Sequence, residues 1–241
     1  MAPSSVFHFP IQTLSNDRVK LVPFDPEHHI DTFFRLSEPH PELYAHMSHG
    51  PYPSAAKLKA EFYERGNKHL ISFTNPDTFT FAIIDKTRPP SPEDAEGELA
   101  GTVSYCHTSA EHLATEIGFI IILPPYQRSH VATNALGLVL NYALNEPDQG
   151  GLGLRRVHWK ASAANSASSR LAERMGFERV GFTPWHMRFI KGKEKGKIGN
   201  GKEPPPGSDP ADLWRDTVDL SLAWDQWQRG AKEKTQKAMV R

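Results

Sequence analysis

Nine consecutive residues, Thr115 to Leu123 (TEIGFIIIL), are almost all apolar, and most of the apolar side chains are β-branched. A strand with one solvated face alternates apolar and polar residues, so this unbroken run is typical of a strand buried on both faces. Pro124 and Pro125 end the run, and a polar loop leads into a helix that we predict from about His130 to Leu144. Such a strand needs strands beside it and helices over both faces, which favours an α/β fold with a mixed sheet.

The periodicity along the rest of the chain predicts a single domain of this class over residues 17–238. Residues 1–16 lack periodicity and are expected to form a flexible arm. Residues 191–212 are rich in lysine, glycine and proline, and we expect a mobile hairpin insert with a solvated, lysine-rich tip. The predicted strands are 18–24, 78–85, 98–106, 115–123, 155–160, 177–190 and 215–222, and the predicted helices are about 26–37, 54–68, 130–144, 165–175 and 223–237.

Composition narrows the function classes. Lysine and arginine total 28, as do aspartate and glutamate, and the formal charge of zero argues against a dedicated nucleic-acid-binding module. The single cysteine, Cys106, excludes an intramolecular disulfide and a multi-cysteine zinc site, and no predicted helix face carries an H-x-x-x-H pair, so no metal site is predicted. Because the chain has no apolar leader and no run long enough to span a bilayer, we expect a cytoplasmic protein without membrane contacts.

The loop after the apolar run is suited to binding phosphate. A helix N-terminus offers unpaired backbone N–H groups and about half a positive charge. Here the N–H groups of residues 129–133 follow Arg128, which adds a full positive charge. Together they favour a phosphate or pyrophosphate site, although a polar turn that binds nothing has the same pattern. The chain contains neither the P-loop sequence nor the G-x-G-x-x-G fingerprint.

Two motifs resemble those of a known family. Residues 127–132 (QRSHVA) are similar to the pyrophosphate-binding motif [QR]-x-x-G-x-[GA] of the GNAT acetyltransferase superfamily, with His130 in the place of the glycine. Residues 165–181 (NSASSRLAERMGFERVG) resemble its second motif, N-x-x-S-x-x-x-x-x-x-x-G-F-x-x-x-G. Residues 41–54 and 215–227 also resemble segments of the RimJ/RimL-like branch of N-acetyltransferases.

The resemblance implies a central mixed, mostly antiparallel sheet flanked by helices and an acetyl-CoA-dependent N-acetyltransferase activity. In this family a primary amine, from a protein N-terminus or a small molecule, attacks the thioester directly, and no metal takes part. Acetyl-CoA lies between two splayed strands with its pantetheine arm along one strand edge. A homodimer through the sheet edge is compatible with the sequence. The residues expected to bind acetyl-CoA are Ile120, Ile121, Ile122, Gln127, Arg128, Ser129, His130, Val131, Ala132, Thr133, Asn165 and Ser168.

Direct transfer needs a base for the ammonium and a hydrogen-bond donor for the departing thiolate. Glu116, at the start of the strand that would carry the cofactor, is our candidate base, although an edge glutamate in a salt bridge fits equally well. His107 is the second candidate because imidazole titrates near neutrality. Many family members have a tyrosine where this chain has Ala172, so Ser168 becomes the candidate thiolate partner, or else a capping residue of its own helix.

The acceptor side carries weaker signals. Tyr44, His46 and Tyr52 lie in the proline-rich loop where the resembling family builds its acceptor wall, and His107 is a further candidate. Packing is the alternative for the two tyrosine rings. Two other functions stay open at this point: a catalytically silent acyl-CoA-binding or regulatory protein, and an α/β interaction domain. The expected partners are acetyl-CoA and an amine acceptor.

Overall fold

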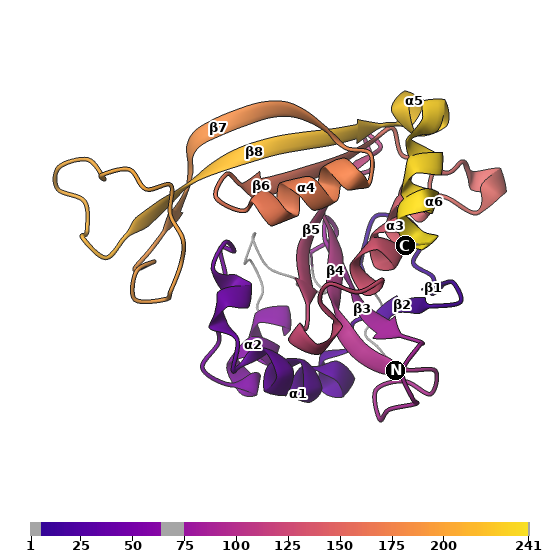
Figure 1. Ribbon diagram of the computed structural model, residues 1–241, viewed down its shortest axis with the longest axis horizontal. Coiled ribbons are helices and arrows are strands. Elements are labelled where there is room, and N and C mark those ends of the chain that lie inside the picture. The colour runs from indigo at the N-terminus through magenta and orange to yellow at the C-terminus, as the bar shows by residue number, and fades with distance from the viewer. Residues whose placement is uncertain (1–5, 64–74, 241) are drawn as a thin grey trace.

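The computed structural model describes residues 6–63 and 75–240, which form one mixed sheet flanked by helices (Figure 1). Its strand order is β1-β2-β3-β4-β5-β6-β8-β7, and every neighbouring pair is antiparallel except the parallel pair β5 and β6. The predicted fold class, a mostly antiparallel mixed sheet with flanking helices, is confirmed. The strands are β1 (Leu14–Ser15), β2 (Val19–Pro23), β3 (Phe79–Asp85), β4 (Glu98–Ser109), β5 (Ala114–Ile122), β6 (Arg156–Ser162), β7 (Glu178–Phe189) and β8 (Leu213–Ala223).

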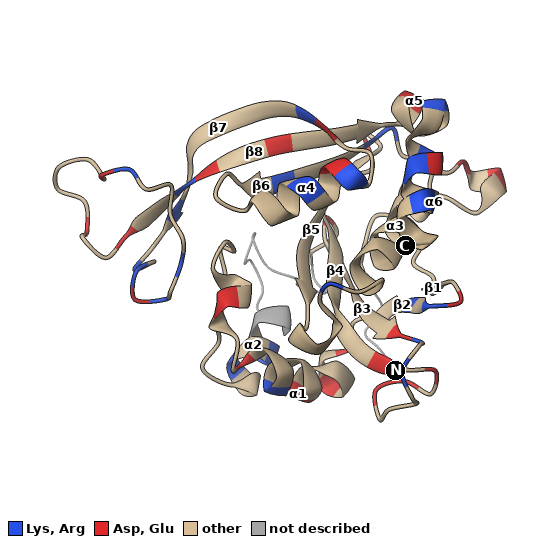
Figure 2. Cartoon of the chain, viewed as in Figure 1, with Lys and Arg blue, Asp and Glu red and all other residues tan. Residues whose placement is uncertain are grey.

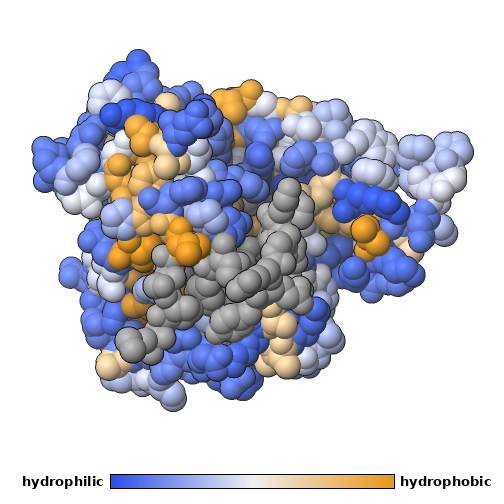
Figure 3. All heavy atoms as spheres, turned by 180° about the vertical axis from the view of Figure 1, so that it is seen from behind, coloured by the Kyte–Doolittle hydropathy of each residue, from blue (hydrophilic) through white to orange (hydrophobic). Residues whose placement is uncertain are grey.

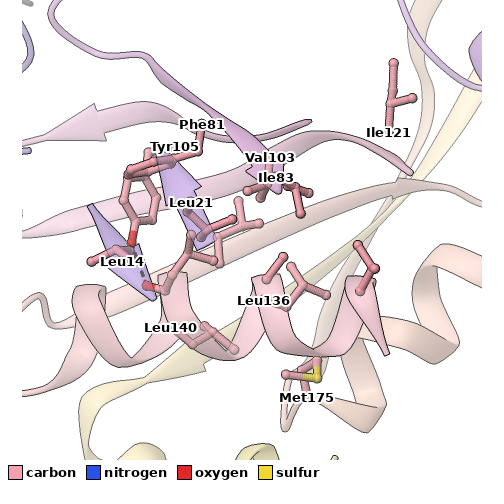
Figure 4. Packing of buried hydrophobic residues seen from close by; sticks show 14 of the residues in the cluster. Leu14, Leu21, Phe81, Ile83, Val103, Tyr105, Ile121, Leu136, Leu140 and Met175 are labelled. Carbon is pink, nitrogen blue, oxygen red and sulfur yellow. Dashed lines mark hydrogen bonds between the residues drawn. The ribbon is translucent and has the colours of Figure 1, made fainter. Parts of the chain in front are cut away.

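The helices pack on the sheet on both sides of the β5–β6 pair. Helix α3 packs across β1 to β6, α4 packs on β6 and β8, and α6 contacts both helices. Side chains of α3 and of the central strands meet in the buried core, where the Tyr105 hydroxyl donates to the Val139 carbonyl oxygen at 2.5 Å and ties β4 to α3 (Figure 4). The helices are α1 (Pro26–Ser37), α2 (Ala55–Tyr63), α3 (Val131–Leu144), α4 (Ser166–Arg174), α5 (Trp224–Gln226) and α6 (Lys232–Val240).

The capping pattern sets the start of α1 as the sequence predicts. Asp25 is the N-cap and its side chain accepts a hydrogen bond from the Glu27 N–H at 3.0 Å, while Pro26 occupies the first helical position. Helix α2 follows Ser54, whose hydroxyl accepts from the Lys57 N–H at 3.1 Å. The predicted continuation of this helix to residue 68 lies partly outside the described residues.

The N-terminal segment contacts the sheet over its described part, residues 6–16, while the flexibility of the whole arm stays a prediction. Leu14 belongs to β1, pairs with β2 and is buried. The ring of Phe7 stacks on Tyr105 with centroids 6.2 Å apart and also packs on Phe79. Burial of these apolar side chains holds a segment that has no regular periodicity.

The insert between β7 and β8 also departs from its prediction at one residue. Lys197, expected at a solvated tip, is only 7% exposed, and its ammonium donates to the carbonyl oxygens of Tyr44 at 2.8 Å and His49 at 2.6 Å. At its base, the Lys191 N–H donates to the Asp212 carboxylate at 2.8 Å. The insert therefore contacts the loop after α1, and its mobility stays a prediction.

The surface is predominantly polar. The face opposite to that of Figure 1 is mostly hydrophilic, with apolar side chains gathered in limited areas (Figure 3). In the described part of the chain, no helix combines the length and apolar character that a membrane crossing requires. The exposed large apolar residues are Val6, Val180, Phe182, Ile190, Ile198, Trp224 and Val240.

A buried histidine in α1 predicts acid sensitivity. The Asp25 N–H donates to His29 Nδ1 at 2.9 Å, so the ring acts there as a neutral acceptor. Burial lowers the pKa of His29 to about 4. Because the unfolded chain takes up this proton first, the free energy of unfolding should fall as the pH drops from about 6.5 to 4, by up to about 1.4 kcal/mol per pH unit from this residue. Urea unfolding followed by tryptophan fluorescence at several pH values measures the slope. His29→Gln should flatten it, and an unchanged slope would contradict the assignment.

Candidate active site

Two neighbouring strands separate part of the way along the sheet. The pairing of β5 with β6 is restricted to residues 114–116 and 156–158, and beyond Glu116 the strands diverge. The register of β4 and β5 shifts nearby, where Phe119 has a φ of +50° and its carbonyl oxygen accepts from the Thr102 hydroxyl at 3.3 Å. Such a bulge bends a strand and increases its twist. A cleft of about 1140 Å³ opens at this point, lined by residues of β5, β6, α4, β8 and the loop after α1.

The exposed edge of β5 forms one wall of the cleft. Ile120, Ile121 and Ile122 all line it. Among the described residues, no strand pairs with this part of β5 on its β6 side. The backbone groups of this edge can therefore accept an extended ligand in the manner of an added strand.

The loop from β5 to α3 lies at one end of the cleft. Gln127 is held there because its side-chain amide donates to the Ile122 carbonyl oxygen at 2.9 Å. Arg128 is exposed and has a φ of +57°, and no described carboxylate lies within 4 Å of it. Gln127, Arg128 and Ala132 all line the cleft. The guanidinium and the N-terminus of α3 thus present positive charge to it.

The remaining loop residues shape the backbone of the helix start. The Ser129 hydroxyl donates to the Tyr126 carbonyl oxygen at 2.5 Å and accepts from the Val131 N–H at 3.3 Å. The Thr133 hydroxyl donates to the His130 carbonyl oxygen at 3.1 Å, and the Val131 side chain is fully buried. The hydroxyls of Ser129 and Thr133 and the N–H of Val131 are thus occupied within the loop. Any contact of the helix start with a ligand would come from the other backbone N–H groups.

His130, in the position of the motif's glycine, does not crowd the loop. Its Nε2 lies 3.1 Å from Oδ1 of Asp85 at the end of β3, and its side chain is mostly buried. The ring is therefore directed into the sheet. The helix start remains accessible although a side chain replaces the glycine.

Helix α4 provides the opposite wall. The Asn165 side chain caps the helix by accepting from the Ser168 N–H at 3.1 Å. The Ser168 hydroxyl oxygen accepts from the Trp159 indole N–H at 3.0 Å. Indole only donates, so the hydroxyl hydrogen of Ser168 points elsewhere, and among the described residues it has no acceptor. Asn165, Ser168 and Trp159 all line the cleft.

A charged cluster occupies the point where β5 and β6 part. The Glu116 carboxylate is buried and lies 3.1 Å from His107 Nδ1 and 3.6 Å from the Lys160 ammonium. Its hydrogen bond raises the pKa of the His107 imidazole. The structure brings together the two candidate bases named from the sequence, and the His107 ring extends toward solvent.

Cys106 completes a group of three potential metal ligands with His107 and Glu116, whose ligand atoms lie within 4.8 Å of one another. Burial raises the pKa of the Cys106 thiol well above its usual value, so the thiol stays protonated. It is directed at the Glu116 backbone carbonyl oxygen, 3.5 Å away. Metal ligation requires a thiolate, which this environment disfavours.

The comparison with protein families agrees with this geometry. Residues 18–178 match the family model described as "Acetyltransferase (GNAT) domain". The chain belongs to the GNAT acetyltransferase family. Membership implies acetyl-CoA-dependent acetyl transfer, whereas a place in the RimJ/RimL-like branch stays a prediction. Over 90 residues this GNAT chain is 32% identical to a Bacillus subtilis protein named "Uncharacterized N-acetyltransferase YoaA", and the match spans 48% of that protein.

Solved GNAT structures share the fold. A GCN5-related N-acetyltransferase from Brucella melitensis is 24% identical, with a TM-score of 0.69 covering 95% of this chain and 85% of that one. A probable GNAT acetyltransferase from Chromobacterium violaceum is 22% identical, with a TM-score of 0.69 and coverage of 95% and 98%. Spermidine N-acetyltransferase from Vibrio cholerae, in complex with CoA and spermine, is 17% identical, with a TM-score of 0.60 and coverage of 88% and 99%.

Of the residues predicted on the acceptor side of this GNAT chain, some line the cleft and others do not. His46 lines the cleft. Tyr44 is buried, donates to the Ser37 hydroxyl at 3.4 Å and packs edge-on against Tyr52, and neither tyrosine is among the cleft-lining residues of the described chain. Their placement fits the packing alternative.

The polar cleft-lining residues that sequence reasoning missed include Lys160, His186 and Arg215. Lys160 could have been suspected, since it lies in the strand parallel to the one that carries Glu116. Arg215 and His186 come from β8 and β7, and no local pattern marks them as site residues. They meet the cleft only through the order of the strands.

Proposed function

We propose that this protein transfers the acetyl group of acetyl-CoA to a primary amine by direct attack, with Glu116 as general base. The observation that carries the proposal is the cleft itself. It combines a positively charged helix start at Arg128 with a buried carboxylate at Glu116, and the unpaired edge of β5 runs between them. No covalent intermediate on the chain is required.

The residues present fit acetyl-CoA. The backbone N–H groups at the start of α3 and the Arg128 guanidinium would hold the pyrophosphate. The edge of β5 would hydrogen-bond the pantetheine amides, with Asn165 near the opposite wall. This arrangement would orient the thioester toward the point where β5 and β6 separate.

The chemistry needs two protons to leave the amine nitrogen. The protonated amine first gives a proton to Glu116, directly or through water, which frees its lone pair to attack the thioester carbonyl carbon. As the C–S bond breaks, the adduct nitrogen loses its second proton to solvent, and CoA leaves as the thiolate. His107, hydrogen-bonded to that carboxylate and open to solvent, provides a route for the proton to leave. The unengaged hydroxyl hydrogen of Ser168 would hydrogen-bond the departing sulfur, in the role that the family's tyrosine fills at the position of Ala172.

Two measurements test the proposal. Calorimetry should detect 1:1 binding of acetyl-CoA and CoA, and a thiol-release assay with a panel of primary amines should detect turnover above hydrolysis. Absence of binding at millimolar ligand would refute the acetyltransferase proposal. Binding without turnover for any amine, including peptides with free N-termini, would favour the catalytically silent alternative.

A further inference from the structure

We propose that the amine acceptor carries a carboxylate and that Arg215 binds it. The inference rests on the proposed function and deepens it by naming a substrate class. Its basis is a buried cation that faces the cleft and has no carboxylate within 4 Å in the described part of the chain.

Arg215 lies on β8 and is only 8% exposed, yet it lines the cleft. Its Nε donates to the Thr217 hydroxyl at 3.0 Å, and its Nη1 donates to the His46 carbonyl oxygen at 3.3 Å. Both acceptors are neutral. Among the described residues no carboxylate lies within 4 Å of the guanidinium, and Nη2 has no hydrogen-bond partner there.

A buried guanidinium cannot lose its charge by deprotonation, because its pKa stays far above neutrality. A buried charge without a counter-ion is energetically unfavourable. Supplying an oppositely charged group next to it is therefore strongly stabilising. Burial lowers the pKa of Arg215, and the carboxylates of Glu116 and Asp219 oppose that change from beyond contact distance. Among the described residues, no carboxylate contacts this guanidinium, and the site is therefore suited to an anionic ligand.

The described carboxylates near Arg215 each have another contact. Asp219, which lies beyond 4 Å of the guanidinium, accepts from the Thr183 hydroxyl at 3.0 Å. Asp216, the next residue along β8, accepts from Lys202, Asn200 and the Trp185 N–H. Asp212 pairs with Arg188. Figure 2 shows basic residues on β7 and β8 where these strands enter the insert.

The charge of the cleft also argues for an anionic acceptor. The two carboxylates that line it among the described residues both have partners: Glu116 contacts His107 and Lys160, and Glu42 contacts His40. Burial lowers the pKa values of the two lining histidines beside Arg215, so both are neutral at pH 7 and add no positive charge to the cleft. These two residues are His46 and His186.

The same balance disfavours a polycation. The Vibrio cholerae neighbour was solved with spermine, but a polyamine here would meet the Arg215 guanidinium, which has no carboxylate within 4 Å among the described residues. A carboxylate suits a guanidinium because its two oxygens match the donor geometry. With Glu116 receiving the ammonium proton and Arg215 holding the carboxylate, the acceptor would be fixed at two points.

Matched pairs of amines test this class. We would compare phenylalanine with phenethylamine, lysine with cadaverine, and β-alanine with propylamine, each pair differing in the carboxylate. For at least one pair we expect the carboxylate member to have a kcat/KM at least about tenfold higher. Spermidine and phosphoethanolamine serve as polycationic and phosphate-bearing controls.

Variants then link the preference to the residue. Arg215→Met should abolish the preference by lowering kcat/KM for the carboxylate member at least about tenfold, while leaving the partner amine and the acetyl-CoA Kd nearly unchanged. Arg215→Lys should retain part of it, which keeps the test usable if the methionine variant is unstable. Arg188→Met is the matched control, since Arg188 also lines the cleft but is paired with Asp212. It should keep the preference.

Several results would overturn the inference. One is that the decarboxylated amines are used as well as or better than their carboxylate partners, or that spermidine or phosphoethanolamine is preferred. Another is that Arg215→Met lowers kcat/KM equally for both members of a pair. A third is that no carboxylate amine is acetylated although acetyl-CoA binds. Failure to bind acetyl-CoA in calorimetry would instead refute the proposed function, and this inference with it.

Discussion

Glu116→Gln is expected to lower kcat at neutral pH by about 10²- to 10⁴-fold, the range typical for loss of a general base. Glutamine has nearly the same shape, so the contacts to His107 and Lys160 can be replaced without a cavity. The loss should shrink as the pH rises, because a larger fraction of the amine is then already deprotonated. Stopped-time assays of product formation from pH 6 to 10 measure this profile.

A spectroscopic readout separates this role from a structural one. The Glu116 hydrogen bond raises the pKa of His107, so the His107 pKa should fall in Glu116→Gln when followed by NMR titration of the ring protons. His107→Gln is the control, and it should lower the rate much less than Glu116→Gln. A rate for Glu116→Gln equal to that of the wild type at every pH would remove this residue as the base.

Arg128→Glu is expected to weaken acetyl-CoA binding by at least about 100-fold. A hydrogen bond to a charged group contributes about 1.5–3 kcal/mol, and the substitution adds repulsion to its loss. Stability should change little because the side chain is exposed and, within the described chain, has no ion-pair partner. Calorimetry measures the Kd. Because salt screens exposed charges, the Kd values of the variant and the wild type should become more similar as salt is added.

Two controls make the Arg128 result specific. Arg128→Ala should weaken acetyl-CoA binding less, since it removes the attraction to the pyrophosphate without adding a negative charge that repels it. Acetyl-pantetheine lacks the pyrophosphate, so its weak binding should be the same for Arg128→Glu and the wild type. An unchanged acetyl-CoA Kd in the charge-reversed variant would show that this loop does not hold the pyrophosphate.

Local sequence patterns predict much of this fold because the signals are local. The apolar run at residues 115–123 became β5, at residues 114–122, and the Asp25–Pro26 cap marks the start of α1. The phosphate loop is visible because strand end, loop and helix start are contiguous in the chain. Ser168 could be named because it lies within the second family motif, and Glu116 because it lies at the start of the apolar run.

The acceptor side resists the same reasoning for a physical reason. Arg215 reaches the cleft because β8 lies between β6 and β7, and it meets His46, which is distant in sequence. In an alternating strand an inward arginine cannot be distinguished from an outward one without the register. Lys197 likewise follows a solvated pattern, and its burial depends on carbonyl groups that a remote loop supplies.

The hydrogen bonds of Lys197 have a consequence for how such a catalyst can be modified. They join the β7–β8 insert to the loop that carries His46, whose carbonyl oxygen accepts from Arg215. The wall that would face the acceptor is thus braced by a segment that contains neither family motif. Under the proposed function, changes in this insert would therefore alter acceptor selectivity without touching the residues proposed to bind acetyl-CoA.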